Sequence, residues 1–242
     1  MGGVKGGSNV GGGPAGGTSG AAGAGGEGVA DSDDANRWAT GATLYVDDDP
    51  GCEGFVPCYR TLEDARSAAK HGDTILVLPG SYAGMRFGQY KNLGSLRILG
   101  RDGPATTTIT GPCFKIFSEA HPPGEIWVEG FTFRDCGPAT ASSADGWGLY
   151  ISAQSAADVQ VRNNVFGDQN GSGGLDLYSL GNARVHVVVT GNRFLNERKR
   201  DDNWGQFWAA LFLDLSGSSE RDDDVYVRVE NNLFAGNAVG AS

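Results

Sequence analysis

The phrase "VRNNVF" at residues 161–166 returns as "VTGNRF" at 189–194 and "VENNLF" at 229–234, with a fainter copy, "VEGFTF", at 128–133. The third position of every copy is Gly or Asn, the two residues that most readily adopt the left-handed backbone conformation. Each phrase therefore predicts a strand that ends in a sharp corner, and the corner returns at the same place in every copy.

The fourth and sixth positions of the phrase predict contacts between successive copies. Recurring Asn side chains can hydrogen-bond to the equivalent residue one layer away, and recurring Phe rings can stack. The predicted Asn ladder consists of Asn164, Asn192 and Asn232. The predicted aromatic stack consists of Phe133, Phe166, Phe194 and Phe234.

A second strand lies between the phrases, as "FKIF" at 114–117, "LYIS" at 149–152, "LDLY" at 175–178 and "LFLD" at 211–214. Alternation places one apolar set of these residues on the inner face. The opposite face then carries two columns, Lys115, Tyr150, Asp176 and Phe212, and Phe117, Ser152, Tyr178 and Asp214.

Constant strands with irregular spacing between them indicate a solenoid whose insertions fall in loops. A β-sandwich is the alternative, since it also contains short strands, but it would not require Gly or Asn, Asn and Phe to recur in phase. We expect an all-β chain in which residues 39–242 form a right-handed parallel β-helix. Residues 1–38 are rich in glycine and predict a disordered linker.

Both ends of the predicted solenoid need cover, because an open end exposes unpaired strand edges. At the N-terminal end, residues 61–73 predict a short capping helix with Thr61 as N-cap, Asp64 three residues later, and Gly72 as the stop. At the other end the chain stops just after a repeat phrase. We therefore expect either a C-terminally incomplete domain or a last coil covered by a loop or a partner.

The segments "LYVDDDPG" at 44–51 and "YRTLEDARSAAKHGDTILVLPGSYAG" at 59–84, together with the recurring "NNxF", resemble the pectin-lyase-like superfamily of right-handed parallel β-helices. The resemblance covers roughly 43–242. It implies the fold more strongly than any activity, because members include polysaccharide lyases, glycoside hydrolases, epimerases and adhesins. In its enzymes the substrate lies along the outward face of one parallel sheet.

Charge and cysteine content restrict the function further. The net charge of −10 and pI of 4.7 argue against a nucleic-acid binder and against binding to anionic membranes. No stretch is long and apolar enough to span a bilayer, and the N-terminus shows no signal peptide.

The four cysteines favour disulfides, and hence an extracellular or cell-envelope location, over four buried thiols. We predict a Cys52–Cys58 bond. Cys113 and Cys136 lie about one compact coil apart, and the sequence leaves their pairing open.

The predicted outward columns supply candidate catalytic and substrate-binding residues. Asp176 and Asp214 would lie roughly 8 Å apart, a separation that suits an inverting glycoside hydrolase. Lys115, Tyr150 and Tyr178 are candidate glycan-binding residues on the same face. The loop "LNERKRDDNWGQFWAA" at 195–210 adds the candidates Arg198, Lys199, Arg200, Trp204 and Trp208. The alternatives are an ordinary solvated face and a loop whose tryptophans pack on the solenoid.

No metal site or cofactor is predicted, although the acidic triplets Asp47–Asp49 and Asp222–Asp224 are the type of cluster that calcium favours. Three functions follow. The first is a secreted or surface glycan-binding protein. The second is a polysaccharide lyase or glycoside hydrolase, and the third is a structural or adhesive repeat protein without a ligand.

Overall fold

The structure is a computed structural model of the whole chain. It describes residues 41–87, 95–118, 124–137, 146–153, 157–167, 173–180, 185–196, 209–216 and 225–237. The predicted linker at 1–38 lies outside these ranges. Within them, parallel strands form three stacked sheets, with one short α-helix near the N-terminal end.

Each sheet is built from strands that recur along the chain. Sheet A contains, in spatial order, β2 (Cys58–Tyr59), β1 (Thr43–Val46), β3 (Thr74–Val77), β6 (Leu96–Gly100), β9 (Gly124–Glu129), β12 (Ala157–Arg162), β15 (Val185–Thr190) and β18 (Val225–Glu230). Sheet B contains β4 (Gly80–Ala83), β7 (Thr107–Gly111), β10 (Thr132–Cys136), β13 (Val165–Gly167), β16 (Arg193–Leu195) and β19 (Leu233–Ala235). Sheet C contains β5 (Arg86–Phe87), β8 (Phe114–Ser118), β11 (Trp147–Ala153), β14 (Gly173–Leu180) and β17 (Ala209–Ser216).

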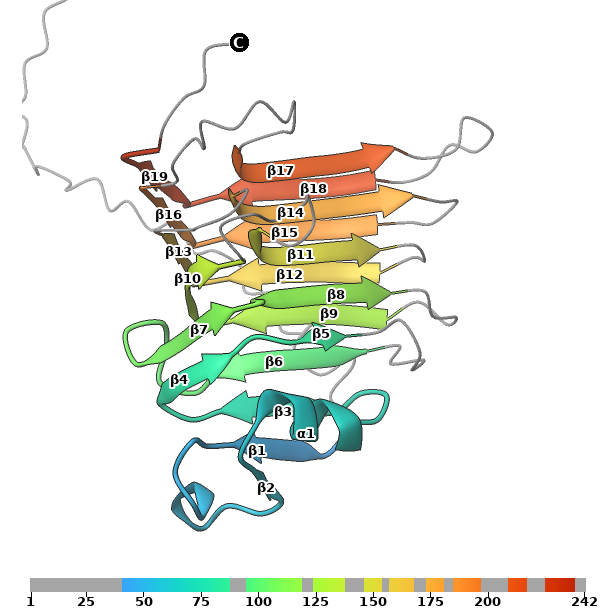
Figure 1. Cartoon of the computed structure of the whole chain (residues 1–242). Coiled ribbons are helices and arrows are strands. Elements are labelled where there is room, and N and C mark those ends of the chain that lie inside the picture. The colour runs from blue at the N-terminus through green and yellow to red at the C-terminus, as the bar shows by residue number, and fades with distance from the viewer. Residues whose placement is uncertain are drawn as a thin grey trace, which may run out of the picture.

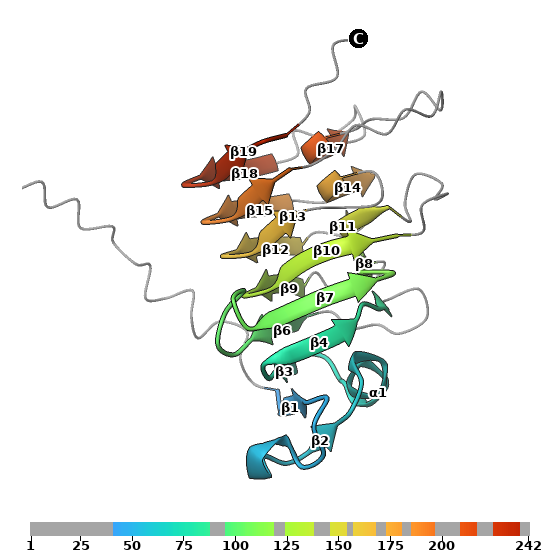
Figure 2. The same cartoon turned by 60° about the vertical axis from the view of Figure 1, so that its left-hand side comes forward.

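From β3 onward the chain passes through sheets A, B and C in turn and then begins the next coil. Every strand pairs in parallel with its counterpart one coil away, as in β12 with β9 and β15. Figure 1 shows the coils rising in chain order toward β17, β18 and β19, and Figure 2 brings sheet B to the front. This confirms the parallel all-β solenoid and excludes the β-sandwich, whose sheets are antiparallel.

The repeated phrase spans two sheets, which differs from the single strand expected before its corner. Val161 pairs with Val128 and Val189 in sheet A. Phe166 pairs with residues of sheet B. Asn163 forms the corner between them with φ 51°, and the other copies have Gly130, Gly191 and Asn231 at positive φ. Each full coil therefore has three strands, because the left-handed residue turns the chain into a third sheet.

The Asn side chains of the phrase lie inside the corner and form a ladder between coils. Asn164 is fully buried, and its Oδ1 accepts from the Phe131 N–H at 3.0 Å while its Nδ2 donates to the Val128 carbonyl at 3.1 Å. Asn192 and Asn232 repeat this arrangement one and two coils further along. The ladder satisfies backbone groups that the sharp corner would otherwise leave buried without partners.

The Phe residues of the phrase form a continuous stack within the core. Neighbouring ring centroids are 5.1, 5.0 and 4.8 Å apart from Phe133 through Phe166 and Phe194 to Phe234, with nearly parallel rings. Valines of sheet A and leucines of sheet C complete the same buried cluster. The in-phase recurrence of the phrase thus packs identical residues against one another along the solenoid.

The N-terminal end is covered by β1, β2 and the helix α1 (Leu62–Ala68). Thr61 caps the helix, since its hydroxyl accepts from the Asp64 N–H at 3.0 Å, and Leu62 and Ala65 are buried. The helix ends at Ala68, before the predicted stop, because Ala69 is already extended. Gly72 adopts positive φ in the turn that follows.

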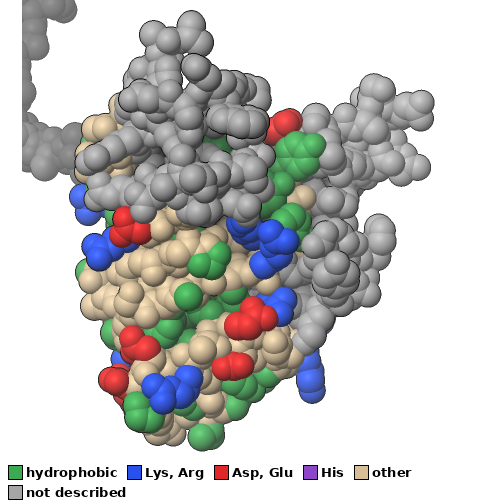
Figure 3. Space-filling view, viewed as in Figure 1, with side chains coloured by type: hydrophobic (Ala, Val, Ile, Leu, Met, Phe, Trp, Pro, Cys, Tyr) green, Lys and Arg blue, Asp and Glu red, His purple; other side chains and the backbone are tan. Residues whose placement is uncertain are grey.

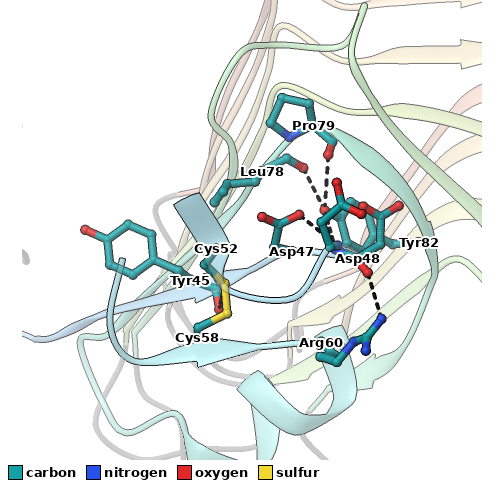
Figure 4. The surroundings of a disulfide bond; sticks show 10 residues. Tyr45, Asp47, Asp48, Cys52, Cys58, Arg60, Leu78, Pro79 and Tyr82 are labelled. Carbon is teal, nitrogen blue, oxygen red and sulfur yellow. Dashed lines mark hydrogen bonds between the residues drawn. A yellow bond between two sulfur atoms is a disulfide. The ribbon is translucent and has the colours of Figure 1, made fainter. Parts of the chain in front are cut away.

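Both cysteine pairs form disulfides. Cys52–Cys58 closes the loop beside β1, with the two Cα atoms 5.7 Å apart (Figure 4). Cys113–Cys136 joins neighbouring coils with a Cα separation of 5.4 Å. The second pair forms because Cys136 arrives one coil above the corner between β7 and β8.

Candidate functional site

The outward side of sheet C aligns polar and aromatic side chains in two columns. The strand register places Arg86, Lys115, Tyr150, Asp176 and Phe212 in one column. The second column consists of Phe117, Ser152, Tyr178 and Asp214. These nine residues are called the sheet C face below. Parallel pairing without a register shift along these positions brings them together from five strands.

Asp176 is the most perturbed acid of the sheet C face. Its Oδ1 is buried and has no hydrogen-bond partner among the described residues. Burial, followed by the negative charge of Asp214, raises the pKa of Asp176 to about 6. A carboxyl group held in this way keeps its proton into the mildly acidic range and can donate a hydrogen bond or a proton there.

The N-terminal end of the same column is formed by two cationic residues, Arg86 and Lys115. Burial, with a smaller contribution from the charge of Arg86, lowers the pKa of Lys115. The Lys115 side chain is only 4% exposed. It therefore pairs in register with Tyr150, as the sequence predicted, but offers little surface for direct contact.

Aromatic rings extend along the sheet C face. Phe117 and Tyr150 lie 5.6 Å apart by their centroids, and the Arg86 guanidinium lies 5.6 Å above the Phe117 ring. Trp147 approaches Phe212 at 6.4 Å. The Trp147 ring occupies the space beside Gly173, where a Cβ atom would come within 2.6 Å of it.

Asp176 and Asp214 belong to adjacent coils and are offset by two positions along their strands, because Asp176 pairs with Phe212 and Tyr178 pairs with Asp214. Parallel-sheet dimensions then place the Cα atoms of Asp176 and Asp214 roughly 8 Å apart. The influence of Asp214 on the pKa of Asp176 is consistent with such a separation. The pair therefore suits one carboxylic acid and one carboxylate that act on opposite sides of a bond.

The structure brings together five of the predicted site residues, namely Lys115, Tyr150, Asp176, Tyr178 and Asp214. The other predicted residues, Arg198, Lys199, Arg200, Trp204 and Trp208, lie outside the described residues, and their role stays a prediction.

Two neighbours were missed in the sequence. Arg86 belongs to a two-residue strand too short to show alternation. Trp147 approaches Phe212 across an intervening coil, and no sequence pattern predicts that contact.

The acidic triplet Asp47–Asp49 lies at the corner after β1, where Asp48 contacts β4 of sheet B and not the sheet C face. One carboxylate oxygen from each residue falls within 4.8 Å of the others. Figure 4 shows how this corner is held. The Asp48 N–H donates to the Tyr82 hydroxyl, and Arg60 donates to the Asp48 carbonyl. These contacts explain the corner, and we derive no calcium site from it. The second triplet, Asp222–Asp224, lies outside the described residues.

The described surface carries acidic and basic side chains in mixture, as Figure 3 shows over the lower part of the molecule. No helix in the described part of the chain is long and apolar enough to cross a membrane. Comparisons of the chain with protein-family models, curated proteins and solved structures find no match. By its structure, the described part of the chain belongs to the class of parallel three-sheet solenoids, with a polar and aromatic outward face on sheet C.

Proposed function

We propose that this chain is a secreted or cell-surface right-handed parallel β-helix protein, similar to the pectin-lyase-like superfamily, that binds a glycan along the sheet C face. The observation that carries the proposal is the alignment of Tyr150, Asp176, Tyr178 and Asp214 in adjoining columns with Phe117 and Phe212. Aromatic rings pack on the apolar faces of sugars, and carboxylates accept hydrogen bonds from sugar hydroxyls. The two disulfides support an oxidising compartment.

The orientation of the sheet C face suits a linear polymer better than a compact ligand. Its residues come from five successive strands spaced about 4.8 Å apart. An extended chain that follows the solenoid axis would meet a new pair of side chains at each coil. The half-buried aromatic residues would then contact successive sugar units.

Binding to a panel of soluble polysaccharides, measured by calorimetry, tests this proposal. Tyr178→Ala should weaken binding about tenfold, since one aromatic contact contributes about 1.4 kcal/mol. Tyr45→Ala is the matched control, because Tyr45 is an outward tyrosine of sheet A at the N-terminal end. Equal loss of affinity in both variants would contradict a site on sheet C. An absence of binding to every polysaccharide would favour the structural or adhesive alternative.

Hydrolysis of the bound glycan is the second candidate, and the raised pKa of Asp176 favours it. In this mechanism the protonated Asp176 donates to the leaving oxygen while Asp214 activates a water molecule, and the anomeric configuration inverts. Reducing-end release should disappear in Asp176→Asn while glycan binding remains. Asp158→Asn, a half-buried aspartate of sheet A, is the control. Products that absorb as unsaturated sugars would instead indicate a lyase.

A further inference from the structure

Two aspartates and two aromatic residues alternate on β14 and β17 of the sheet C face. The outward positions of β14 carry Asp176 and then Tyr178, and those of β17 carry Phe212 and then Asp214. The register sets Asp176 beside Phe212 and Tyr178 beside Asp214. The two carboxylates therefore occupy one diagonal of a four-residue cell, and the two rings occupy the other. These four residues are called the checkerboard cell below.

The checkerboard cell is small enough for one ligand group to meet all four side chains. Neighbouring strands are about 4.8 Å apart, and alternate residues of one strand are about 7 Å apart. The centre of the cell thus lies about 4 Å, measured along the sheet, from each of the four Cα atoms. A group held above this centre faces a carboxylate on two sides and an aromatic ring on the other two.

The carboxylates of the checkerboard cell repel each other. The Oδ1 atom of Asp176 is buried and has no hydrogen-bond partner among the described residues. Besides burial, the negative charge of Asp214 raises the pKa of Asp176. The next cation along the same column is Lys115, two coils away and beyond Tyr150. The charges of the cell therefore favour a cation that comes from outside the described part of the chain.

Sheet A shows how this chain fills a similar arrangement when it supplies the cation itself. On β9 a carboxylate and a ring also occupy alternate outward positions, Glu125 and Trp127. Arg97, one coil earlier, pairs with Trp127 in the register. Its guanidinium lies 4.9 Å from the centroid of the Trp127 ring and forms an ion pair with Glu125 at 2.9 Å. The residues one coil before Asp176 and Tyr178 are Tyr150 and Ser152, and neither is a cation.

We propose that the checkerboard cell binds a positively charged amino group, and that the glycan of the sheet C face therefore contains amino sugars with free amines. This inference rests on the proposed function, because it names the chemistry of the glycan that this face would bind. An ammonium group above the centre of the cell donates to both carboxylates, and its charge faces the rings of Tyr178 and Phe212.

Two further observations favour an amine as the ligand of the checkerboard cell. The net charge of −10 favours the approach of a cationic polymer over an anionic one. A calcium ion fits the cell less well than an amine, because calcium takes roughly six to eight oxygen ligands and the ring faces supply none.

Calorimetry with hexasaccharides that differ only at the amine tests the inference. The probes are the hexamer of glucosamine and its fully N-acetylated form. The glucosamine hexamer should bind at least about tenfold more tightly near neutral pH, because only this form carries the cation. A trimethylated glucosamine hexamer, whose charge is permanent, should keep most of this preference, which separates the charge from the missing acetyl group. Added salt should weaken binding of the charged forms and leave the acetylated form unchanged.

Isosteric variants connect the preference to the checkerboard cell. Asp176→Asn and Asp214→Asn should each reduce the preference for the amine at least about threefold, and the double variant should abolish it. Binding of the acetylated hexamer should stay unchanged in all three. Asp158→Asn is the matched control, since it removes a half-buried carboxylate from sheet A, and it should leave the preference intact. Circular dichroism verifies that the variants are folded.

The outcomes separate this inference from the proposed function. Equal binding of the glucosamine and acetylated hexamers, lost in Tyr178→Ala, would overturn the inference and leave a neutral glycan on the same face. Binding of neither hexamer, while another polysaccharide binds through Tyr178, would overturn it as well. A preference that survives in the double variant, or that Asp158→Asn also removes, would place the amine elsewhere. Tight binding of calcium alone, abolished by Asp176→Asn, would assign the cell to a metal ion instead. An absence of binding to every polysaccharide would overturn both proposals.

Discussion

Replacing Asn164 by alanine should be among the most destabilising substitutions in the solenoid. The side chain is fully buried at the first position of the Asn ladder. Its removal leaves the Phe131 N–H and the Val128 carbonyl without their hydrogen bonds, which are 3.0 and 3.1 Å long. It also removes one of the two donors to Asn192 Oδ1.

The expected cost follows from the two backbone groups. Each buried polar group that loses its partner costs about 1–3 kcal/mol. Asn164→Ala should therefore lower the free energy of unfolding by about 4 kcal/mol. Asn232→Ala removes comparable bonds, to the Asn192 N–H and the Val189 carbonyl, but Asn232 is only half-buried and water can replace them. Its cost should be about half as large.

Urea denaturation followed by circular dichroism measures both values, with the disulfides kept oxidised. A lower midpoint at an unchanged slope reports lost stability rather than a change in the denatured state. A cost below about 1 kcal/mol for Asn164→Ala, or an equal cost for Asn232→Ala, would refute the view that the ladder stabilises the corner by satisfying buried backbone groups.

Two further predictions concern charge and covalent links. Asp176 has its pKa raised from 3.8 to about 6 in the fold, so its ionisation costs stability as pH rises through that window. Asp176→Asn should therefore raise the melting temperature at pH 7 and leave it unchanged below pH 4. Replacing Cys113 and Cys136 by serine should cost about 3 kcal/mol, against about 2 for Cys52 and Cys58, because the first bond closes the longer loop.

Differential scanning calorimetry at several pH values checks the first of these predictions, and denaturation of the two double variants checks the second. A gain in Asp176→Asn that is equal at pH 4 and pH 7 would mean that burial of the charge is not its cause. A larger loss of stability on removal of the Cys52–Cys58 bond, which closes the shorter loop, would show that this bond stabilises the N-terminal end through local contacts rather than through chain entropy.

Much of the architecture could be predicted because it repeats. In the three clearest copies of the phrase, the third position is Gly or Asn, the fourth is Asn and the sixth is Phe. This recurrence predicts the corner, the ladder and the stack, since equivalent residues of a parallel solenoid stack on one another. The capping helix was predicted from Thr61 and Asp64, which form a local contact. Such features depend on neighbours in sequence or on strict periodicity, and both are visible in a single chain.

The division of each coil into three strands was not predicted. A corner after Val161 is visible in the sequence, but the angle at which the chain leaves it depends on packing of the next segment. The Cys113–Cys136 bond was left open for a similar reason. Its formation requires two corners from neighbouring coils to meet, and the number of residues between them does not determine that distance.

The candidate site also combines features that the sequence predicted with features that only the tertiary structure shows. Alternation and repeat register determined by themselves that Tyr150, Asp176, Tyr178 and Asp214 share one outward face, because the side-chain period of a strand is two. Only the tertiary structure decided that Lys115 is buried, that Arg86 extends its column, and that one oxygen of Asp176 has no hydrogen-bond partner among the described residues. Burial and charge come from segments distant in sequence, and these raise the pKa of Asp176 and set what the sheet C face can bind.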